Sequence, residues 1–306
     1  MGRRIAAALA VLLALGFARP ARADDAPAPP QIVYAKIPAR PALWTVRGPK
    51  GTAYLFGSIH ILPPQVDWHA KDIDAALAKA DVLVFELAMD ATFQERVRGY
   101  IQARGMLPPG QHLRDMLSPA ARGEFDSEVA ALPVSPAVLD RMRPWLAALT
   151  IETTGIAKQH YAPQSGVEMQ LQNGETKDSR PVIGLETIEQ QLALLAPDDP
   201  KIELQAFEAS LTDSQARSRQ EVGPLLDAWM HGDVRKLGRL TDAALAKYPQ
   251  ARKLLFDDRN QAWVKQIALL LDQDKVYFIT VGAGHLVGPR GVPALLRAKG
   301  FRVEGP

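Results

Sequence analysis

Two histidines in this chain follow a glycine at the same spacing, and each Gly-x-x-His unit ends an apolar run. The first unit ends at His60 after the run 52–56, and the second ends at His285 after the run 275–281. Runs of this length, rich in β-branched and aromatic residues, are typical of buried strands. Each histidine is therefore expected at the carboxyl end of a strand, where open α/β sheets bind their ligands.

Two glutamates stand at the ends of further apolar runs. Glu86 lies near the end of 81–87 and Glu186 ends 180–186. A carboxylate there is costly to bury unless it is paired or binds a metal. Two imidazoles and one or two carboxylates form a ligand set suited to Zn²⁺, Mn²⁺, Co²⁺ or Fe²⁺, and an imidazole with a carboxylate also serves acid–base chemistry without metal. The alternative is that all four are hydrogen-bonded strand-end residues.

Other motifs that could carry chemistry are weaker. The four remaining histidines lie in polar loops or helices and are expected to be solvated: His69, His112, His160 and His231. The sequence contains neither a His-Glu-x-x-His helix motif nor a Gly-x-Ser-x-Gly elbow. The glycines before and after His285 resemble a dinucleotide loop only loosely, because their spacing is wrong.

The elements that must position these residues follow from periodicity. Runs 43–46 and 52–56 form a hairpin around a Gly-Pro-Lys-Gly turn, and a helix over 69–80 leads to the strand 81–87 in parallel. A helix that continues from Glu186 to residue 195 would put Glu186 and Gln190 on one face. Residues 90–160 and 201–272 are expected to be mostly helical. Arg141 and Arg143 are either both solvated, or one of them faces the site. A helix over 292–299 and a strand over 301–303 end the chain.

The fold class expected is α/β, a mixed β-sheet with helices on both faces and a large helical insertion between its two halves.

Composition narrows the class of protein. The 306 residues are 47% hydrophobic and 23% charged, as in a globular protein, and the formal net charge is +2. That charge is too small to indicate nucleic acid or an anionic membrane surface as a partner. Without any cysteine the chain has no disulfides and no thiolate ligands.

The first residues read as a targeting segment. Arg3 and Arg4 precede an apolar stretch, 5–17, that is short for a membrane span, and Ala21-Arg22-Ala23 is a small-x-small cleavage site. We expect a signal peptide over 1–23 cut after Ala23, with an uncleaved anchor as the alternative. A flexible Pro/Ala-rich lead-in over 24–40 and one domain over 41–306 would follow. The mature chain, periplasmic or secreted, is expected to have no membrane span.

The same residues, taken together with others, resemble the TraB/GumN family from about residue 41 onward. The resemblance is carried by these pieces: Leu43-Trp44, Gly57-Ser58-Ile59-His60, Leu62-Pro63, the strand into Glu86, Arg143-Pro144-Trp145, Gly184-Leu185-Glu186 with Gln190, Arg259-Asn260, and Gly282-x-Gly284-His285-Leu286 with Gly288 and Gly291. This family is similar to the TIKI proteins, described as Mn²⁺- or Co²⁺-dependent proteases, and more distantly to erythromycin esterases and a haem-binding lipoprotein group. The resemblance implies an active site of His60, His285 and Glu86, with Glu186, Arg259 and Asn260 at further motif positions.

The leading hypothesis is an exported, metal-dependent, peptidase-like hydrolase that acts on a peptide or another small carbonyl substrate. His60 and His285 would be ligands of Mn²⁺, Co²⁺ or Zn²⁺, Glu86 a ligand or the general base, and Arg259 or Asn260 an oxyanion donor. One rival is a non-catalytic binding protein for haem, iron or polysaccharide. A second rival is an esterase-type hydrolase that uses His and Glu without metal.

Overall fold

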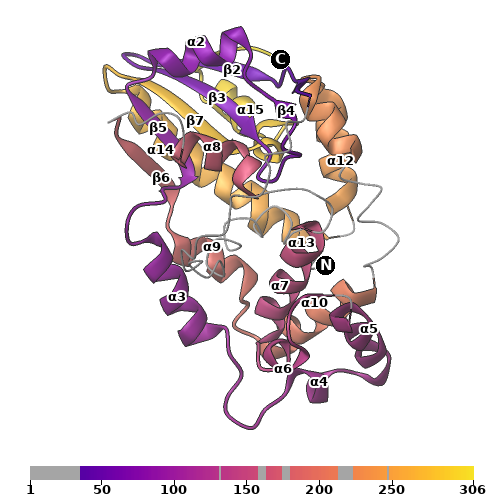
Figure 1. Ribbon diagram of the computed structural model, residues 1–306. Helices are drawn as coiled ribbons and strands as arrows, with labels where there is room; N and C mark the ends of the chain where they lie inside the picture. Colours follow the sequence, from indigo (N-terminus) through magenta and orange to yellow (C-terminus); the bar gives the residue numbers. More distant parts are fainter. Residues whose placement is uncertain (1–34, 131, 158–162, 174–179, 213–222, 247) are drawn as a thin grey trace, which may run out of the picture.

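The computed structural model describes residues 35–130, 132–157, 163–173, 180–212, 223–246 and 248–306 (Figure 1). The predicted signal peptide, most of the predicted lead-in and His160 lie outside these residues. The end of the predicted flexible lead-in contains a short strand. Strand β1 (Ile37–Pro38) pairs in parallel with β4 (Val66–Asp67), so the packed chain begins before residue 41.

A mixed six-stranded sheet organises the chain, in the order β6-β5-β7-β3-β2-β8. Its strands are β2 (Leu43–Arg47), β3 (Thr52–Ser58), β5 (Val82–Leu87), β6 (Val182–Glu186), β7 (Val276–Gly282) and β8 (Arg302–Glu304). The predicted hairpin is the antiparallel pair β2–β3. Strands β3, β7, β5 and β6 are parallel, so their carboxyl ends meet at one edge of the sheet.

Helices cover both faces of this sheet, as expected (Figure 1). Phe56 and Phe278 point to one face and pack with α2 (Lys71–Lys79), α8 (Val167–Asn173) and α12 (Val234–Leu245). The alternate residues Leu55 and Ile279 point to the other face and pack with α14 (Asp258–Leu271) and α15 (Val292–Ala298). This alternation follows from the two-residue period of a strand, and it leaves the central strands buried on both sides.

The predicted helical insertion is a cluster of helices with its own hydrophobic core, drawn below the sheet in Figure 1. Its helices are α3 (Phe93–Arg104), α4 (Leu113–Met116), α5 (Pro119–Ala130), α6 (Pro136–Leu139), α7 (Pro144–Ala157), α9 (Ile188–Leu195) and α10 (Pro200–Thr212). The insertion contains Arg141 and Arg143, and both use their guanidinium groups within it. Arg143 pairs with Glu203 at 2.6 Å, and Arg141 donates to the carbonyl oxygens of Gln111 and Leu107.

The junction of β6 and α9 differs from the prediction. The strand runs through Glu186, Thr187 is the N-cap, and the helix begins at Ile188. The side chain of Gln190 is used in a capping box with Thr187, so Gln190 does not share a helix face with Glu186. The next residue, Gln191, is 1% exposed and points to the sheet edge instead.

Candidate active site at the carboxyl edge of the sheet

Gly282, the last residue of β7, lies at the centre of the predicted cluster. A Cβ atom built on it would stand 3.3 Å from Glu86 Oε1, 3.6 Å from His285 Cδ2 and 3.7 Å from His60 Nε2. The structure therefore brings together the two histidines and the glutamate of the predicted site around one residue without a side chain. Parallel strand ends make this convergence possible, because β3, β5 and β7 are neighbours in the sheet.

Glu86 is buried and held by donors from three directions. Its Oε1 accepts the Gly282 N–H at 2.7 Å, and its Oε2 accepts from Arg259 Nη2 at 2.6 Å and from Gln191 Nε2 at 3.1 Å. Burial alone would raise the pKa of this carboxyl. The charges of Arg259 and the nearby imidazoles outweigh it and lower the pKa of Glu86 to about 2.

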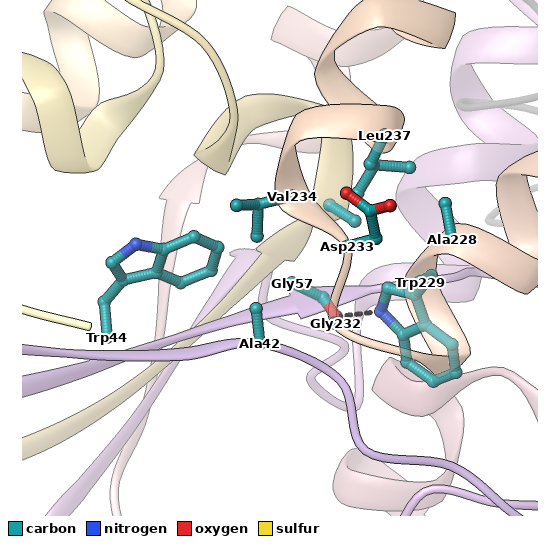
Figure 2. A pocket seen from close by; sticks show the side chains of 10 residues that line it. Ala42, Trp44, Gly57, Ala228, Trp229, Gly232, Asp233, Val234 and Leu237 are labelled. Atoms are coloured by element: carbon teal, nitrogen blue, oxygen red, sulfur yellow. Dashed lines mark hydrogen bonds between the residues drawn. The ribbon is translucent and has the colours of Figure 1, made fainter. Parts of the chain in front are cut away.

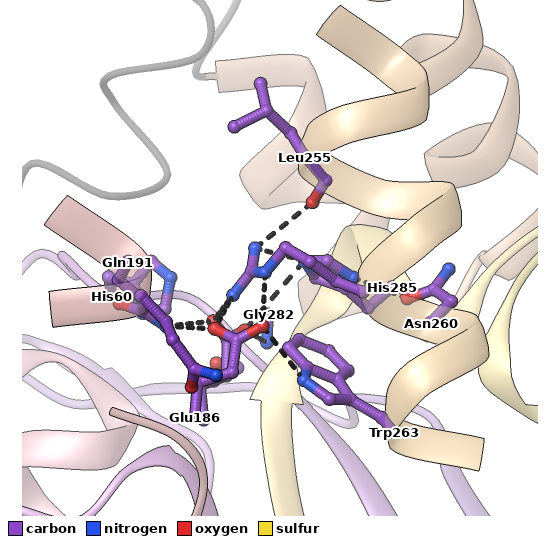
Figure 3. Close-up of polar contacts among 12 residues, drawn as sticks. His60, Glu186, Gln191, Leu255, Asn260, Trp263, Gly282 and His285 are labelled. Atoms are coloured by element: carbon purple, nitrogen blue, oxygen red, sulfur yellow. Dashed lines mark hydrogen bonds and ion pairs between the residues drawn. The ribbon is translucent and has the colours of Figure 1, made fainter. Parts of the chain in front are cut away.

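Arg259, on α14, uses its whole guanidinium group within the cluster. Figure 3 shows its neighbours Glu186, Leu255 and His285 around one centre. Its Nε donates to Glu186 Oε1 at 2.7 Å, and Nη2 reaches both Glu186 Oε2 at 2.8 Å and Glu86. Nη1 donates to Leu255 O and to His285 Nε2 at 3.2 Å. These five contacts match the five N–H groups that arginine has. Burial disfavours this charge, but the two carboxylates dominate and raise the pKa of Arg259.

Glu186, at the end of β6, completes the clamp on Arg259. Its Oε1 also accepts from Trp263 Nε1 at 3.0 Å, and its Oε2 from Gln191 Nε2 at 2.9 Å. The Arg259 guanidinium lies over the Trp263 ring, 4.7 Å from its centroid. A planar, bidentate arginine–carboxylate pair that also stacks on an aromatic ring is a rigid arrangement.

His285 is buried and its tautomer is fixed by two neighbours. Nδ1 lies 2.6 Å from Asn260 Oδ1, which can only accept, so Nδ1 carries the proton. Nε2 accepts from Arg259, and the ring lies between Phe256 and Trp263, with centroids 4.6 and 4.4 Å away. Burial and the Arg259 charge lower the pKa of His285 to about 3, so this imidazole is neutral at ordinary pH.

His60, just after β3, has the opposite protonation state. Its Nδ1 lies 2.7 Å from Glu168 Oε1 on α8, and Ser58 Oγ donates to the same oxygen. Burial alone would lower the pKa of His60, but Glu168, with a smaller effect from Glu86, raises it to about 9. The imidazolium thus donates Nδ1–H to Glu168 and keeps Nε2–H for the side that faces Glu86. The other oxygen, Glu168 Oε2, is buried without a hydrogen-bond partner in the described residues.

Local packing fixes the two glycine-histidine turns. A Cβ on Gly57 would lie 3.0 Å from the Cα of Ala283, in the short helix η5 (Ala283–Leu286), so glycine is what lets β3 and η5 approach. Trp229 Nε1 donates to Gly57 O at 2.7 Å and pins the same strand end (Figure 2). A π-helical segment, η4 (Lys253–Asp257), precedes Arg259, and such segments are frequent at functional sites.

The structure thus gathers every site residue singled out from the sequence: His60, Glu86, Glu186, Arg259, Asn260 and His285. Sequence reasoning missed Gln191, Trp263 and the role of Glu168. Three of the four histidines expected to be solvated lie on the surface of the described chain: His69, His112 and His231. Each has its Nδ1 atom within 3.2 Å of an aspartate oxygen. Their exposed side chains lie outside the cluster.

The fit of a divalent metal at this site is partial. Each histidine has Nδ1 anchored by an oxygen, which is the usual arrangement for imidazoles that bind metal through Nε2. His285 Nε2 lies 4.0 Å from Glu86 Oε1, but the Arg259 guanidinium contacts both side chains. Within the described residues, no three His, Asp or Glu side chains form a group that could hold a metal ion. Imidazole nitrogens and a carboxylate are suitable ligands for a divalent metal. With Arg259 in contact with both Glu86 and His285, however, these atoms are not arranged to coordinate one ion.

Comparison with known proteins gives the chain its family. Residues 42–305 match the pattern of the TraB/PrgY/gumN family. The chain belongs to this family. It is also similar to an uncharacterized protein of Treponema pallidum (strain Nichols), with 24% identity over 84% of this chain and 80% of the relative. The uncharacterized protein YbaP of Escherichia coli (strain K12) is 24% identical over 80% of this chain and 87% of its own length.

The family match covers the whole sheet and every residue of the candidate site. It therefore agrees with the resemblance drawn from the glycine-histidine units and the strand-end glutamates. In the described part of the chain, no helix combines the length and the apolar composition that a membrane crossing requires.

Proposed function

We propose that this family member is a hydrolase that acts on a peptide or another small carbonyl substrate at the carboxyl edge of the sheet. One observation carries the proposal. His60, Glu86 and His285 converge on Gly282 with protonation states pushed apart by their surroundings. Pairs of titratable groups separated in this way are typical of acid–base centres.

The proposed roles follow from these states. His60 is the acid: its free Nε2–H can donate to the carbonyl oxygen of the substrate as negative charge develops there. Its side chain is 12% exposed, more than those of Glu86 and His285. Glu86 is the proton acceptor for the attacking water. When the C–N or C–O bond of the tetrahedral intermediate breaks, Glu86 gives this proton to the leaving group and the carbonyl oxygen returns its proton to His60. Since Arg259 makes Glu86 a weak base, its proton abstraction must be coupled to donation by His60.

Arg259 and Asn260 take positioning roles in this proposal rather than the oxyanion role expected from the sequence. The five contacts of Arg259 leave it no spare N–H for a substrate. Asn260 is 2% exposed, and its amide nitrogen donates to Arg290 O at 2.8 Å. Arg259 keeps Glu86 ionised and Asn260 keeps His285 in one tautomer. Glu168 does the same for His60, because it receives Nδ1–H and leaves Nε2–H for the substrate.

A metal-dependent version of the same hydrolase is the second candidate, favoured by the anchored Nδ1 atoms of both histidines. His60, His285 and Glu86 would then hold Mn²⁺, Co²⁺ or Zn²⁺, after Arg259 moves away from His285. A bound metal would polarise the substrate carbonyl and lower the pKa of water. The buried Glu168 oxygen without a partner is also compatible with an additional cation or donor.

The test is hydrolysis by the full mature chain of p-nitrophenyl acetate and of a mixture of fluorogenic peptides. Both substrates are measured in chelator and again in added Mn²⁺, Co²⁺ or Zn²⁺. His60→Ala and Glu86→Gln should each lower the rate by at least about a hundredfold, the usual scale for loss of an acid or base. His69→Ala is the matched control, because His69 also pairs with a carboxylate but lies on the surface.

The outcomes separate the two candidates. Hydrolysis that persists in chelator supports the His/Glu version, and hydrolysis that requires added metal, together with bound metal lost in His60→Ala, supports the metal version. Wild-type rates in both His60→Ala and Glu86→Gln would show that the cluster is structural. No hydrolysis of either substrate under any of these conditions would count against the hydrolase proposal.

A further inference from the structure

A cavity lies between α12, α15 and the loop that follows His285, and its lining includes none of the candidate-site residues. Its volume is about 350 Å³, within the range of about 300–1,000 Å³ that is typical of small-molecule sites. Apolar side chains form much of its wall, among them Val234, Leu286, Val287 and Pro293. Trp44, which Figure 2 shows near Val234, also lines this cavity.

Positive charge gathers on this cavity. Arg235 and Arg239 are four residues apart on α12, so they share a face, and Arg297 of α15 lies on the same cavity. Like charges at this spacing destabilise a helix slightly. Among the described side chains that line the cavity, only that of Asp242 is acidic, and it is already paired with Arg252. Pro306 also lies on the cavity, where its main-chain oxygen accepts from Trp44 Nε1 at 3.0 Å.

Two glycines lie on the wall of the cavity near these arginines. Gly238 lies between Arg235 and Arg239 on the sequence of α12, and a Cβ there would meet only ordinary contacts, the nearest being Gly288 N and Val287 Cβ, each at 3.7 Å. Gly288 itself has a positive φ of 76° and nothing within 4 Å of its Cβ position. Both glycines line the cavity, and the absence of side chains at these two positions leaves room beside Arg235 and Arg239.

We propose that this cavity binds a small organic anion, a phosphate or carboxylate joined to an apolar body. The arginines supply planar, charged donors that suit such a head group, and the apolar wall suits the body. Nothing in this proposal depends on the hydrolase assignment. The cavity does adjoin η5, because Leu286 and Val287 follow His285 directly.

Calorimetric titration of the full mature chain tests the proposal with three probes. Octyl phosphate carries both parts of the expected ligand, inorganic phosphate carries the head alone, and octyl glucoside carries the chain without charge. Octyl phosphate, kept below its micellar concentration, should bind at least about tenfold more tightly than either of the others. Vesicles of an anionic phospholipid form a fourth arm that distinguishes a free anion from a membrane surface.

Two kinds of variant make the result specific. The double variant Arg235→Gln/Arg239→Gln should weaken octyl phosphate at least about tenfold, and Gly238→Leu should block it by filling the cavity. Arg98→Gln is the control, because Arg98 is an exposed arginine on α3. Binding that is unchanged in both cavity variants, equal binding of octyl glucoside, or binding to vesicles without binding of soluble octyl phosphate would overturn the proposal.

Discussion

His60 Nδ1 lies 2.7 Å from Glu168 Oε1, and this contact joins the end of β3 to α8 beside the sheet. The two residues are 108 positions apart in the chain. Ser58 donates to the same carboxylate oxygen, so the strand end is held twice by one side chain. The contact decides both the charge of His60 and which of its nitrogens faces Glu86.

The first prediction concerns stability at basic pH. The pKa of His60 is raised from 6.5 to about 9 in the folded chain, so its protonation stabilises the fold fully below pH 6.5. That stability is lost as the pH rises through 9, by on the order of 3 kcal/mol. Urea unfolding of the wild type in chelator between pH 6 and 10 should show this loss. Glu168→Gln should flatten the curve over the same interval, and a curve as steep as that of the wild type would contradict the pair.

At acid pH, His285 and Glu86 are expected to set how the free energy of unfolding changes with pH. The pKa of His285 is lowered to about 3 and that of Glu86 to about 2, so both groups bind protons more readily in the unfolded chain. Their contribution is present in full above pH 6.5 and is lost as the pH falls through 4.5 toward 2. We expect the free energy of unfolding to decrease from pH 6.5 to pH 3, and His285→Gln should reduce that slope. An unchanged slope in this variant would show that His285 titrates in the folded chain as it does in the unfolded one.

Loss of the Arg259 clamp should be among the most destabilising single changes at the site. Arg259→Met leaves Glu86 and Glu186 buried without their cation, which typically costs about 3–5 kcal/mol. Thermal and urea unfolding measure the effect. Arg290→Met is the matched control, because Arg290 pairs with Asp257 at 2.8 Å but is 55% exposed, and its loss should cost less than about 1 kcal/mol. Equal melting temperatures for the two variants would mean that the buried clamp adds no stability.

The close approach at Gly57 predicts a steric effect on folding. In Gly57→Ala the new Cβ would lie 3.0 Å from Ala283 Cα and 3.1 Å from Ala283 Cβ, so β3 and η5 must separate slightly. We expect a loss of about 1–3 kcal/mol, the usual cost of overpacking. Gly123→Ala, in α5 with nothing within 4 Å, should instead be neutral or up to about 1 kcal/mol more stable. Urea unfolding of both variants compares them, and a Gly57→Ala protein as stable as wild type would contradict the tight contact.

The export prediction concerns residues that the structure does not describe. If the first 23 residues are a cleaved signal peptide, the protein purified from its native host should begin at Asp24. Intact-mass and N-terminal peptide spectrometry measure this directly. A mature chain that still begins at Met1 would remove the expectation of a periplasmic or secreted location.

Much of this fold and site could be predicted because the information is local in the sequence. Apolar runs between glycines and charged residues indicated β2, β3, β5, β6, β7 and β8 to within two residues. For the central strands β3, β5 and β7 the reason is that a strand buried on both faces requires such runs. Parallel strands separated by helices then placed His60, Glu86, Glu186 and His285 at one edge. The convergence of these residues follows from topology, so it needs no knowledge of side-chain packing.

Only the tertiary structure decided which hydrogen-bond partner each buried polar group has. The helical period predicted Gln190 as the neighbour of Glu186. In the structure the strand runs through Glu186 and the helix begins after the N-cap Thr187, so Gln191 is the residue that donates to Glu186. Glu168 and Trp263 come from distant segments, and no local pattern reports which donor meets which acceptor. The same holds for Arg259: the sequence marks it as a site residue, whereas only the packed chain shows that all five of its N–H groups are used. A buried polar group takes whichever partner the fold brings within reach, because leaving it without one is costly.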